Sequence, residues 1–230
     1  MQKNKKSQKS RQPSPSRKIR RRPGTHGAPK KGKVPRPSNH PAAQAHGSLI
    51  RLRPEYEERY IILHKHVFPG VLARIRKCGI RNYSIFLLDG MLFAHFEYVG
   101  KDFRSDMAAM GDEVTKEWWK LTAPMQLPLE GRAEGEHWAE MENVLFFRKE
   151  DQGKGRVRRL AGVARVPLAT GSEEQIRERI AELESRFHRH PMSALELYRW
   201  DEKVYCYCEV RGDFAIGDLF EEMREVFHTA

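Results

Sequence analysis

The chain has 230 residues, a formal net charge of +11 and a mean hydropathy of −0.72, enough length for one large domain or two small ones. Its apolar runs are far shorter than the roughly 18 to 20 residues of a membrane-spanning helix, and no apolar block follows the basic N-terminus as in a secretory signal. Three cysteines are too few for a disulfide framework, so we expect a reducing cytoplasm and thiols that pack as small apolar side chains.

The positive charge is concentrated in the first 47 residues. This segment holds 14 of the 42 Lys and Arg residues, and the first acidic residue is Glu55. It consists largely of Lys, Arg, Pro, Ser, Gly and Gln, so it cannot bury enough apolar surface to offset the entropy of ordering. We therefore predict that residues 1–47 form a disordered basic tail, able to contact nucleic acid or an anionic surface weakly through its charge. The folded remainder is close to neutral, with 28 basic and 31 acidic residues.

Residues 48–150 form the first predicted domain. Pro54 suits the first turn of a helix, and Asp89-Gly90 is a dipeptide preferred in tight hairpin turns. The predicted elements are, in order, a strand at 48–53, helices at 55–67 and 71–77, a hairpin at 82–99, helices at 102–110 and 112–121, a loop at 122–136 and a strand within 138–147. This β-α-β-β-α-β order predicts an α+β, ferredoxin-like fold with helices on one face of an antiparallel sheet.

Residues 151–230 repeat much of this order. After a charged linker at 148–159, the predicted elements are a strand at 160–168, a helix from Ser172, strands at 194–200 and 203–210, and a helix at 216–227. The sequence EYVGKDF at 97–103 is matched by EVRGDF at 209–214. We predict a diverged repeat of about 110 residues, with shared topology without shared ancestry as the alternative.

Two residues of the first predicted helix are suited to chemistry. Tyr60 and His64 are four residues apart and share one helix face. Histidine exchanges protons near neutral pH because its unperturbed pKa is about 6.5. An aromatic and a histidine on an apolar stripe are nevertheless more often core residues, and the same holds for Tyr83, Trp118 and Trp119.

Taken together, Tyr60-x3-His64, the downstream Pro69, the sequence NYSIF at 82–86 and WWK at 118–120 resemble the L-rhamnose mutarotase family over about residues 48–150. The resemblance implies a dimeric α+β barrel in which a sugar binds between the sheet and the first helix. It places His64 at the position of the proton donor and Tyr60, Tyr83, Trp118 and Trp119 at those of sugar-binding aromatics. It implies an isomerase that interconverts the anomers of L-rhamnose or a related deoxyhexose, without a metal or cofactor.

The sequence also departs from the family. Where the family pattern continues Asn-x-x-Trp-Pro-Glu after the histidine, this chain has KHVFPG at 65–70, so that Lys65, Phe68 and Gly70 replace an amide, a tryptophan and a carboxylate. This leaves the identity of the sugar open. The loop at 129–136 is also lengthened.

The second repeat has neither Tyr-x3-His nor Trp-Trp. We expect it to be catalytically silent and to pack on the first repeat as an internal pseudo-dimer in place of a partner subunit. Two alternatives stay open. One is a non-catalytic scaffold that senses a sugar or binds a partner, with a polyanion-binding tail. The other is a heme-free monooxygenase or cyclase of the wider superfamily.

Overall fold

The computed structural model describes residues 43–149, 156–165, 171–189 and 192–230. Its elements are β1 (Gln44–Leu52), η1 (Pro54–Tyr56), α1 (Glu57–Lys65), α2 (Pro69–Lys77), β2 (Ile80–Leu88), β3 (Met91–Tyr98), α3 (Phe103–Ala108), α4 (Glu113–Thr122), η2 (Ala123–Met125), β4 (Gln126–Leu127), β5 (Ala139–Glu140), β6 (Glu142–Arg148), β7 (Val157–Ala164), α5 (Glu173–His188), β8 (Met192–Trp200), β9 (Lys203–Arg211) and β10 (Phe220–Thr229). Most of the predicted tail lies outside the described residues, but Gln44 to Gly47 belong to β1, so the folded part begins earlier than predicted. No helix among the described residues is long and apolar enough to cross a membrane.

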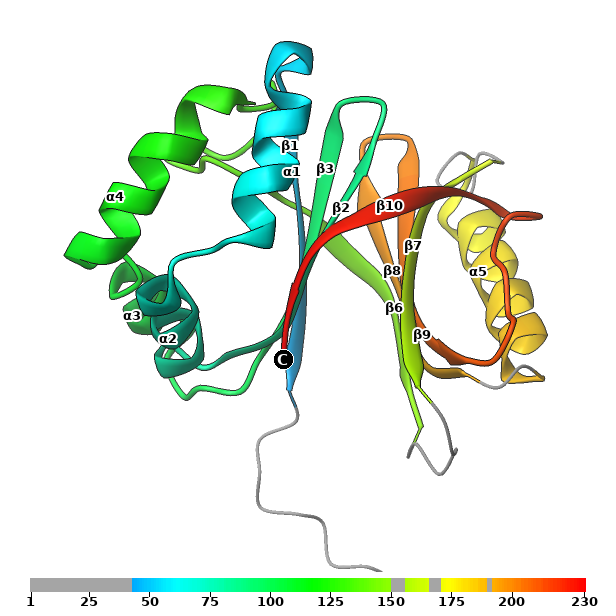
Figure 1. Cartoon of the computed structure of the whole chain (residues 1–230). Coiled ribbons are helices and arrows are strands. Elements are labelled where there is room, and N and C mark those ends of the chain that lie inside the picture. Colours follow the sequence, from blue (N-terminus) through cyan, green and yellow to red (C-terminus); the bar gives the residue numbers. More distant parts are fainter. Residues whose placement is uncertain (1–42, 150–155, 166–170, 190–191) are drawn as a thin grey trace, which may run out of the picture. The chain divides into compact units, whose positions relative to one another are not determined.

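The strands form one antiparallel sheet in the order β4-β1-β3-β2-β10-β7-β9-β8-β6. One residue separates β5, which pairs with β1, from β6, which pairs with β8, so this stretch of chain links the two ends of the sheet. The pairing therefore closes the strands into a barrel. Helices α1, α2 and α4 lie beside β1 to β3, and α5 lies beside β7 to β9 (Figure 1). The fold is α+β with a curled antiparallel sheet, as predicted.

The two hairpins have the same register. Trp200 pairs with Lys203 in the β8–β9 hairpin, 112 residues beyond the pair Leu88 and Met91 in β2–β3. Both hairpins turn through an aspartate in the left-handed region, at Asp89 (φ 47°) and at 201 (φ 51°). Both hairpins also shift register at the end away from the turn. In β8–β9 this shift lies between Met192 and residue 194. This correspondence supports the predicted repeat.

The last strand of each half is shared with the other half. The first part of β10 pairs with β7 of its own half, and its second part pairs with β2 of the first half. In the same way β4 pairs with β1, while β6 pairs with β8. Both crossing strands shift register shortly after they change partner, between Asn143 and Leu145 and between Glu225 and Phe227. The two parts of the chain thus exchange strands, as the predicted pseudo-dimer requires, and the pseudo-dimer itself stays a prediction.

The helix predicted at 216–227 is wrong, since this stretch contains the strand β10. Its buried residues Phe220, Met223 and Val226 recur every third position, which resembles helical spacing. In the structure this spacing arises because the strand changes partner after Met223 and bulges near 226. The predicted linker at 148–159 is also too long, because strands occupy both of its ends, at Arg148 and from Val157.

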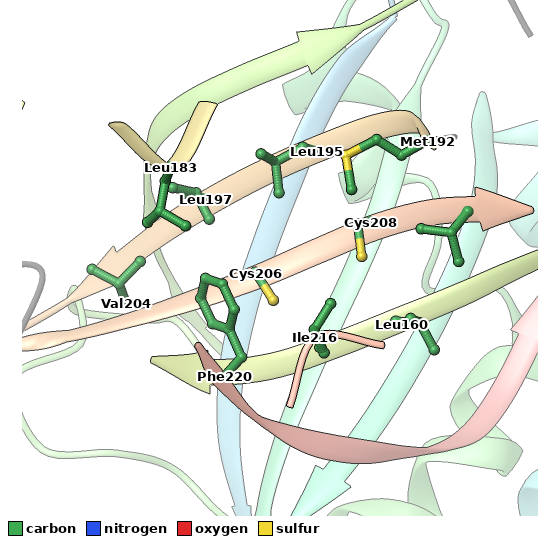
Figure 2. Close-up of a cluster of buried hydrophobic side chains, with 11 residues drawn as sticks. Leu160, Leu183, Met192, Leu195, Leu197, Val204, Cys206, Cys208, Ile216 and Phe220 are labelled. Atoms are coloured by element: carbon green, nitrogen blue, oxygen red, sulfur yellow. The ribbon is translucent and has the colours of Figure 1, made fainter. Parts of the chain in front are cut away.

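Three apolar layers hold the fold together. One lies between the first helices and β1 to β3, and one lies inside the barrel, where Phe86, Phe93, Tyr198, Tyr205 and Tyr207 meet. The third lies between α5 and the second half of the sheet, and Figure 2 shows it. The sulfurs of Cys206 and Cys208 point into this third layer from one face of β9, as their spacing predicts (Figure 2).

A buried carboxylate joins the halves inside the barrel. Glu196 of β8 accepts hydrogen bonds from His95 Nε2 of β3 (2.6 Å), from the Tyr198 hydroxyl (2.7 Å) and from Arg148 (2.7 Å). Arg148 also pairs with Glu97 of β3 (2.8 Å). Burial alone would raise the pKa of Glu196, but the charges of His95 and Arg148 and their hydrogen bonds lower it to about 2. The carboxylate is therefore ionised and paired across the two halves.

We expect Glu196→Gln to lower the free energy of unfolding by about 1.5–3 kcal/mol at pH 7, because a neutral amide in this buried position loses the charge-assisted hydrogen bonds from His95 and Arg148. The pKa of Glu196 in the folded chain, about 2, lies below its ordinary 4.5. The stabilisation is therefore complete above about pH 5 and is lost as the pH falls towards 2. Urea denaturation of both proteins between pH 4 and 7 measures this difference.

The matched control for this experiment is Glu142→Gln. Glu142 forms an exposed ion pair with Arg199, so its loss should cost less than about 1 kcal/mol. Equal unfolding free energies for the two variants would show that the buried carboxylate does not hold the halves together.

Candidate functional site

Three elements bring the predicted site residues to one side of the sheet. Helix α1 starts after a proline-led turn, and the four-residue spacing turns Tyr60 and His64 to its buried face. Helix α4 carries Trp118 and Trp119, and its first turn is capped by the carboxylate of Asp112, which accepts from the backbone N–H of residue 115 (2.9 Å). Strand β2 supplies Tyr83. The predicted residues are thus separate in sequence and close in space.

All five predicted residues line one cavity of about 350 Å³. The other lining residues are Ile85, Thr122, Ala123, Gln126, His137 and Trp138. None of these described lining residues is acidic. Sequence reasoning missed Gln126, His137 and Trp138 because they lie in or beside the segment predicted to be loop, where no periodicity indicates which side chains face a site.

His64 is buried, and its ring orientation is determined by its neighbours. Its Nδ1 donates to the backbone carbonyl of Tyr60 (2.9 Å), so the other ring nitrogen, Nε2, carries the lone pair in the neutral imidazole. Its ring stacks on the Tyr60 ring (3.9 Å between centroids) and meets the edge of Trp118 (5.2 Å). Burial lowers the pKa of His64 to about 4, against the smaller opposing effect of the Tyr60 hydrogen bond. At neutral pH His64 is therefore a proton acceptor.

The two tyrosines of the cavity are hydrogen-bond donors at neutral pH. Burial raises the pKa of Tyr60 well above its ordinary value and that of Tyr83 to about 12, so both phenols keep their protons. Gln126 Nε2 approaches the Tyr60 hydroxyl (3.5 Å), and the Oε1 of the same amide lies 2.9 Å from His137 Nε2. The cavity thus combines aromatic walls with a few polar groups, as small-molecule sites commonly do.

The second half of the chain supports this site through β10. Phe227 of β10 meets the rings of His64 (5.8 Å) and Tyr83 (5.5 Å) edge to face. Arg224, on the same strand, donates to Glu57 at the start of α1 (2.7 Å). The orientation of His64 therefore depends on a strand that begins in the other half of the barrel.

The corresponding region of the second half is filled by apolar side chains. Leu195 and Leu197 stand 112 residues after Tyr83 and Ile85, and both lie in the third apolar layer. Leu183 of α5 packs against them there (Figure 2). A leucine thus stands where the first half has a tyrosine of the cavity wall.

The departures from the family pattern do not line the cavity. Lys65 and Gly70 are exposed, and the ring of Phe68 packs edge to face on Trp118 (5.3 Å). A Cβ at position 70 would lie 2.8 Å from the Cγ1 of Val114, so close packing of α2 on α4 disfavours a larger side chain. Within the described part of the chain, no group of three His, Cys, Asp or Glu side chains is placed to hold a metal ion.

The fold and the site together define an α+β barrel protein with an aromatic cavity built around one buried histidine. Residues 45–147 match the family model of L-rhamnose mutarotase. The L-rhamnose mutarotase of Oceanobacillus iheyensis is 30% identical over 81 residues, covering 34% of this chain and 76% of that protein, and that of Burkholderia ambifaria is 36% identical over 90 residues, covering 34% and 85%. The chain belongs to the L-rhamnose mutarotase family, which consists of isomerases.

Two solved structures match part of the chain at low sequence identity. The L-rhamnose mutarotase of Formosa agariphila is 21% identical, with a TM-score of 0.36, over 44% of this chain and 96% of its own. A putative monooxygenase of Fusobacterium nucleatum is 12% identical, with a TM-score of 0.47, over 80% of this chain and 92% of its own.

We expect the His64 imidazole to titrate near pH 4 in the wild-type protein and at a higher pH in Phe227→Ala. Removing the Phe227 ring admits water beside His64, and burial is the main cause of its low pKa. Histidine NMR signals followed from pH 3 to 8 measure this titration.

Phe146→Ala is the control for the titration, because the Phe146 side chain is 46% exposed on β6. It should leave the titration of His64 unchanged. A wild-type His64 that titrates near 6.5 would show that the residue is not buried as the structure has it.

Proposed function

We propose that the cavity binds free L-rhamnose or a related deoxyhexose and that the chain interconverts its α and β anomers. The observation that carries the proposal is His64, which presents one unprotonated nitrogen in a cavity walled by Tyr60, Tyr83, Trp118 and Trp119. Aromatic rings suit the apolar face and methyl group of a 6-deoxy sugar, while phenol hydroxyls suit its oxygens. The names of the relatives support this substrate class.

Anomer exchange requires two proton transfers and no redox step. In ring opening, His64 Nε2 accepts the proton of the anomeric hydroxyl, the bond between C1 and the ring oxygen breaks, and the ring oxygen receives a proton from a second group. Rotation about C1–C2 then exposes the other face of the aldehyde. Ring closure reverses the transfers, and His64 returns its proton to the anomeric oxygen, which is the donor role that the family resemblance implies.

We expect the purified full-length chain to exchange the anomers of L-rhamnose faster than buffer alone, and His64→Gln to slow this exchange by about 10²- to 10⁴-fold while the fold is retained. NMR saturation transfer between the α and β anomeric protons measures the rate, with L-fucose and D-glucose as comparison sugars. His66→Gln is the matched control, because His66 is exposed and does not line the cavity.

The same measurement separates the main alternative. A folded wild-type protein that exchanges none of the three sugars would favour the non-catalytic sugar-sensing or partner-binding scaffold. Full activity in His64→Gln would overturn the assignment of the proton-transfer group but not the mutarotase itself.

We propose that residues 151–230 form a degenerate repeat that is catalytically silent and replaces a partner subunit. The filled layer under α5 and the exchange of β6 and β10 support this assignment. The boundary near residue 150 stays a prediction, because residues 150–155 lie outside the described residues.

We expect a monomer of about 26.8 kDa in solution, because the strands of one chain already close the barrel. Sedimentation equilibrium measures this mass at several protein concentrations. A stable dimer at micromolar concentration would contradict this expectation, because it would show that the second half of the chain does not replace a partner subunit.

The basic tail is proposed to act independently of the cavity, whose lining residues fall between Tyr60 and Trp138. Residues 1–42 lie outside the described residues, and the family model begins at residue 45. The tail's charge supports weak contact with polyanions. The three buried cysteine thiols support the proposed cytoplasmic location.

A further inference from the structure

His64 is the candidate proton acceptor of the cavity. The residue that donates a proton to the ring oxygen of the sugar has not yet been assigned. A single imidazole with Nδ1 committed to a carbonyl presents one nitrogen, and ring opening needs an acceptor at one sugar oxygen and a donor at the other. The described lining residues contain no carboxylic acid. Among the described lining residues, the groups that can give up a proton are therefore the hydroxyls and the His137 imidazole.

Tyr60 is the residue of the wall that is best placed for this role. Its backbone carbonyl orients His64, its ring stacks on the imidazole, and its hydroxyl faces Gln126. When His64 gains a proton, the new positive charge lies beside the phenol that loses one. The two transfers are therefore electrostatically coupled, because each creates the charge that stabilises the other.

Gln126 and His137 form a hydrogen-bonded chain that leads to this hydroxyl. Gln126 is buried, with 8% of its surface exposed, and its Nε2 points at the Tyr60 hydroxyl (3.5 Å). His137, an exposed residue of the cavity wall, donates from Nε2 to Gln126 Oε1 (2.9 Å). An amide oxygen only accepts, so this contact sets which end of the amide faces Tyr60. Contacts of this kind are often long without substrate and shorten when it binds.

We propose that Gln126, oriented by His137, is a positioning residue that makes the Tyr60 phenol the second proton-transfer group. This inference rests on the proposed mutarotase function. In ring opening the Tyr60 hydroxyl gives its proton to the ring oxygen as the C1–O bond breaks, while His64 Nε2 takes the anomeric proton. The Gln126 N–H donates to the phenolate that forms. On closure both protons return, so atoms and charges balance over the cycle.

The test is a double-mutant cycle on kcat and KM for L-rhamnose, measured by NMR exchange in the full-length chain. We expect Tyr60→Phe to lower kcat by about 10²-fold or more. Gln126→Leu should lower kcat about tenfold with little change in KM, as expected for the loss of one hydrogen bond to a developing charge. The double variant should be no slower than Tyr60→Phe alone, because Gln126 acts through the hydroxyl that this variant lacks.

Variants at position 137 test the outer end of the chain. His137→Leu should reproduce part of the loss in kcat, and His137→Asn should restore it, because an amide N–H can again donate to Gln126. Gln44→Leu, which removes an exposed amide on β1, is the control and should leave both constants unchanged. Melting temperatures of all variants identify any that lose activity by unfolding.

Two outcomes would overturn this inference while the proposed function survives. One is a double variant in which the two losses multiply, since the residues would then act independently. The other is a Gln126→Leu variant that raises KM at constant kcat, since Gln126 would then bind the sugar directly. A folded wild-type protein without anomer exchange would instead end both proposals.

Discussion

The fold depends on the crossing of β10 from one half of the barrel to the other. Its first residues complete the sheet of the second half, and its last residues pair with β2 in the first half. Because β6 makes the reciprocal crossing to β8, neither half has a complete sheet by itself. The same crossing brings the Phe227 ring against His64. The strand pairing that closes the barrel therefore also helps to orient the proposed proton-transfer group.

The interior of the barrel shows how the two halves are kept in register. Two pairs of residues that stand 112 positions apart meet there, as they would at a two-fold axis. The rings of His95 and Tyr207 stack at 3.6 Å between centroids. Glu97 and Glu209 are bridged by Asn82, which donates to both carboxylates (2.6 Å each). Buried charges cost solvation energy unless their hydrogen bonds are satisfied. A slip of either half would separate these partners, so we interpret the polar interior as a source of specificity in pairing the halves.

Much of the first half could be predicted because its signals are local. Asp89-Gly90 produced the expected hairpin turn, and the four-residue spacing placed Tyr60 and His64 on one buried face. The strand β10 could not be predicted in this way, because its burial pattern reflects two different neighbours and a bulge rather than one pleated face. A pattern of buried residues identifies an element only when that element keeps one partner along its length.

The polar part of the candidate site was missed for a related reason. Gln126, in the two-residue strand β4, and His137, in the irregular segment after it, are eleven residues apart, and only the tertiary fold brings the amide to the Tyr60 hydroxyl. The four aromatic wall residues that were predicted come from regular elements whose spacing is visible in the sequence, whereas Gln126, His137 and the aromatic Trp138 belong to a connection without such spacing.

The two halves share the paired hairpin but differ in the elements around the cavity. The segment between β4 and β5, which carries part of the site, has no counterpart along the uninterrupted β10 of the second half. There the wall position of Tyr83 corresponds to Leu195, which packs in the apolar layer under α5. In two identical subunits any residue that improved packing at one site would also fill the other. A single chain removes this constraint, so one half can keep a cavity while the other half is stabilised by a filled core. The second half also contributes to the site through β10, whose Phe227 contacts His64.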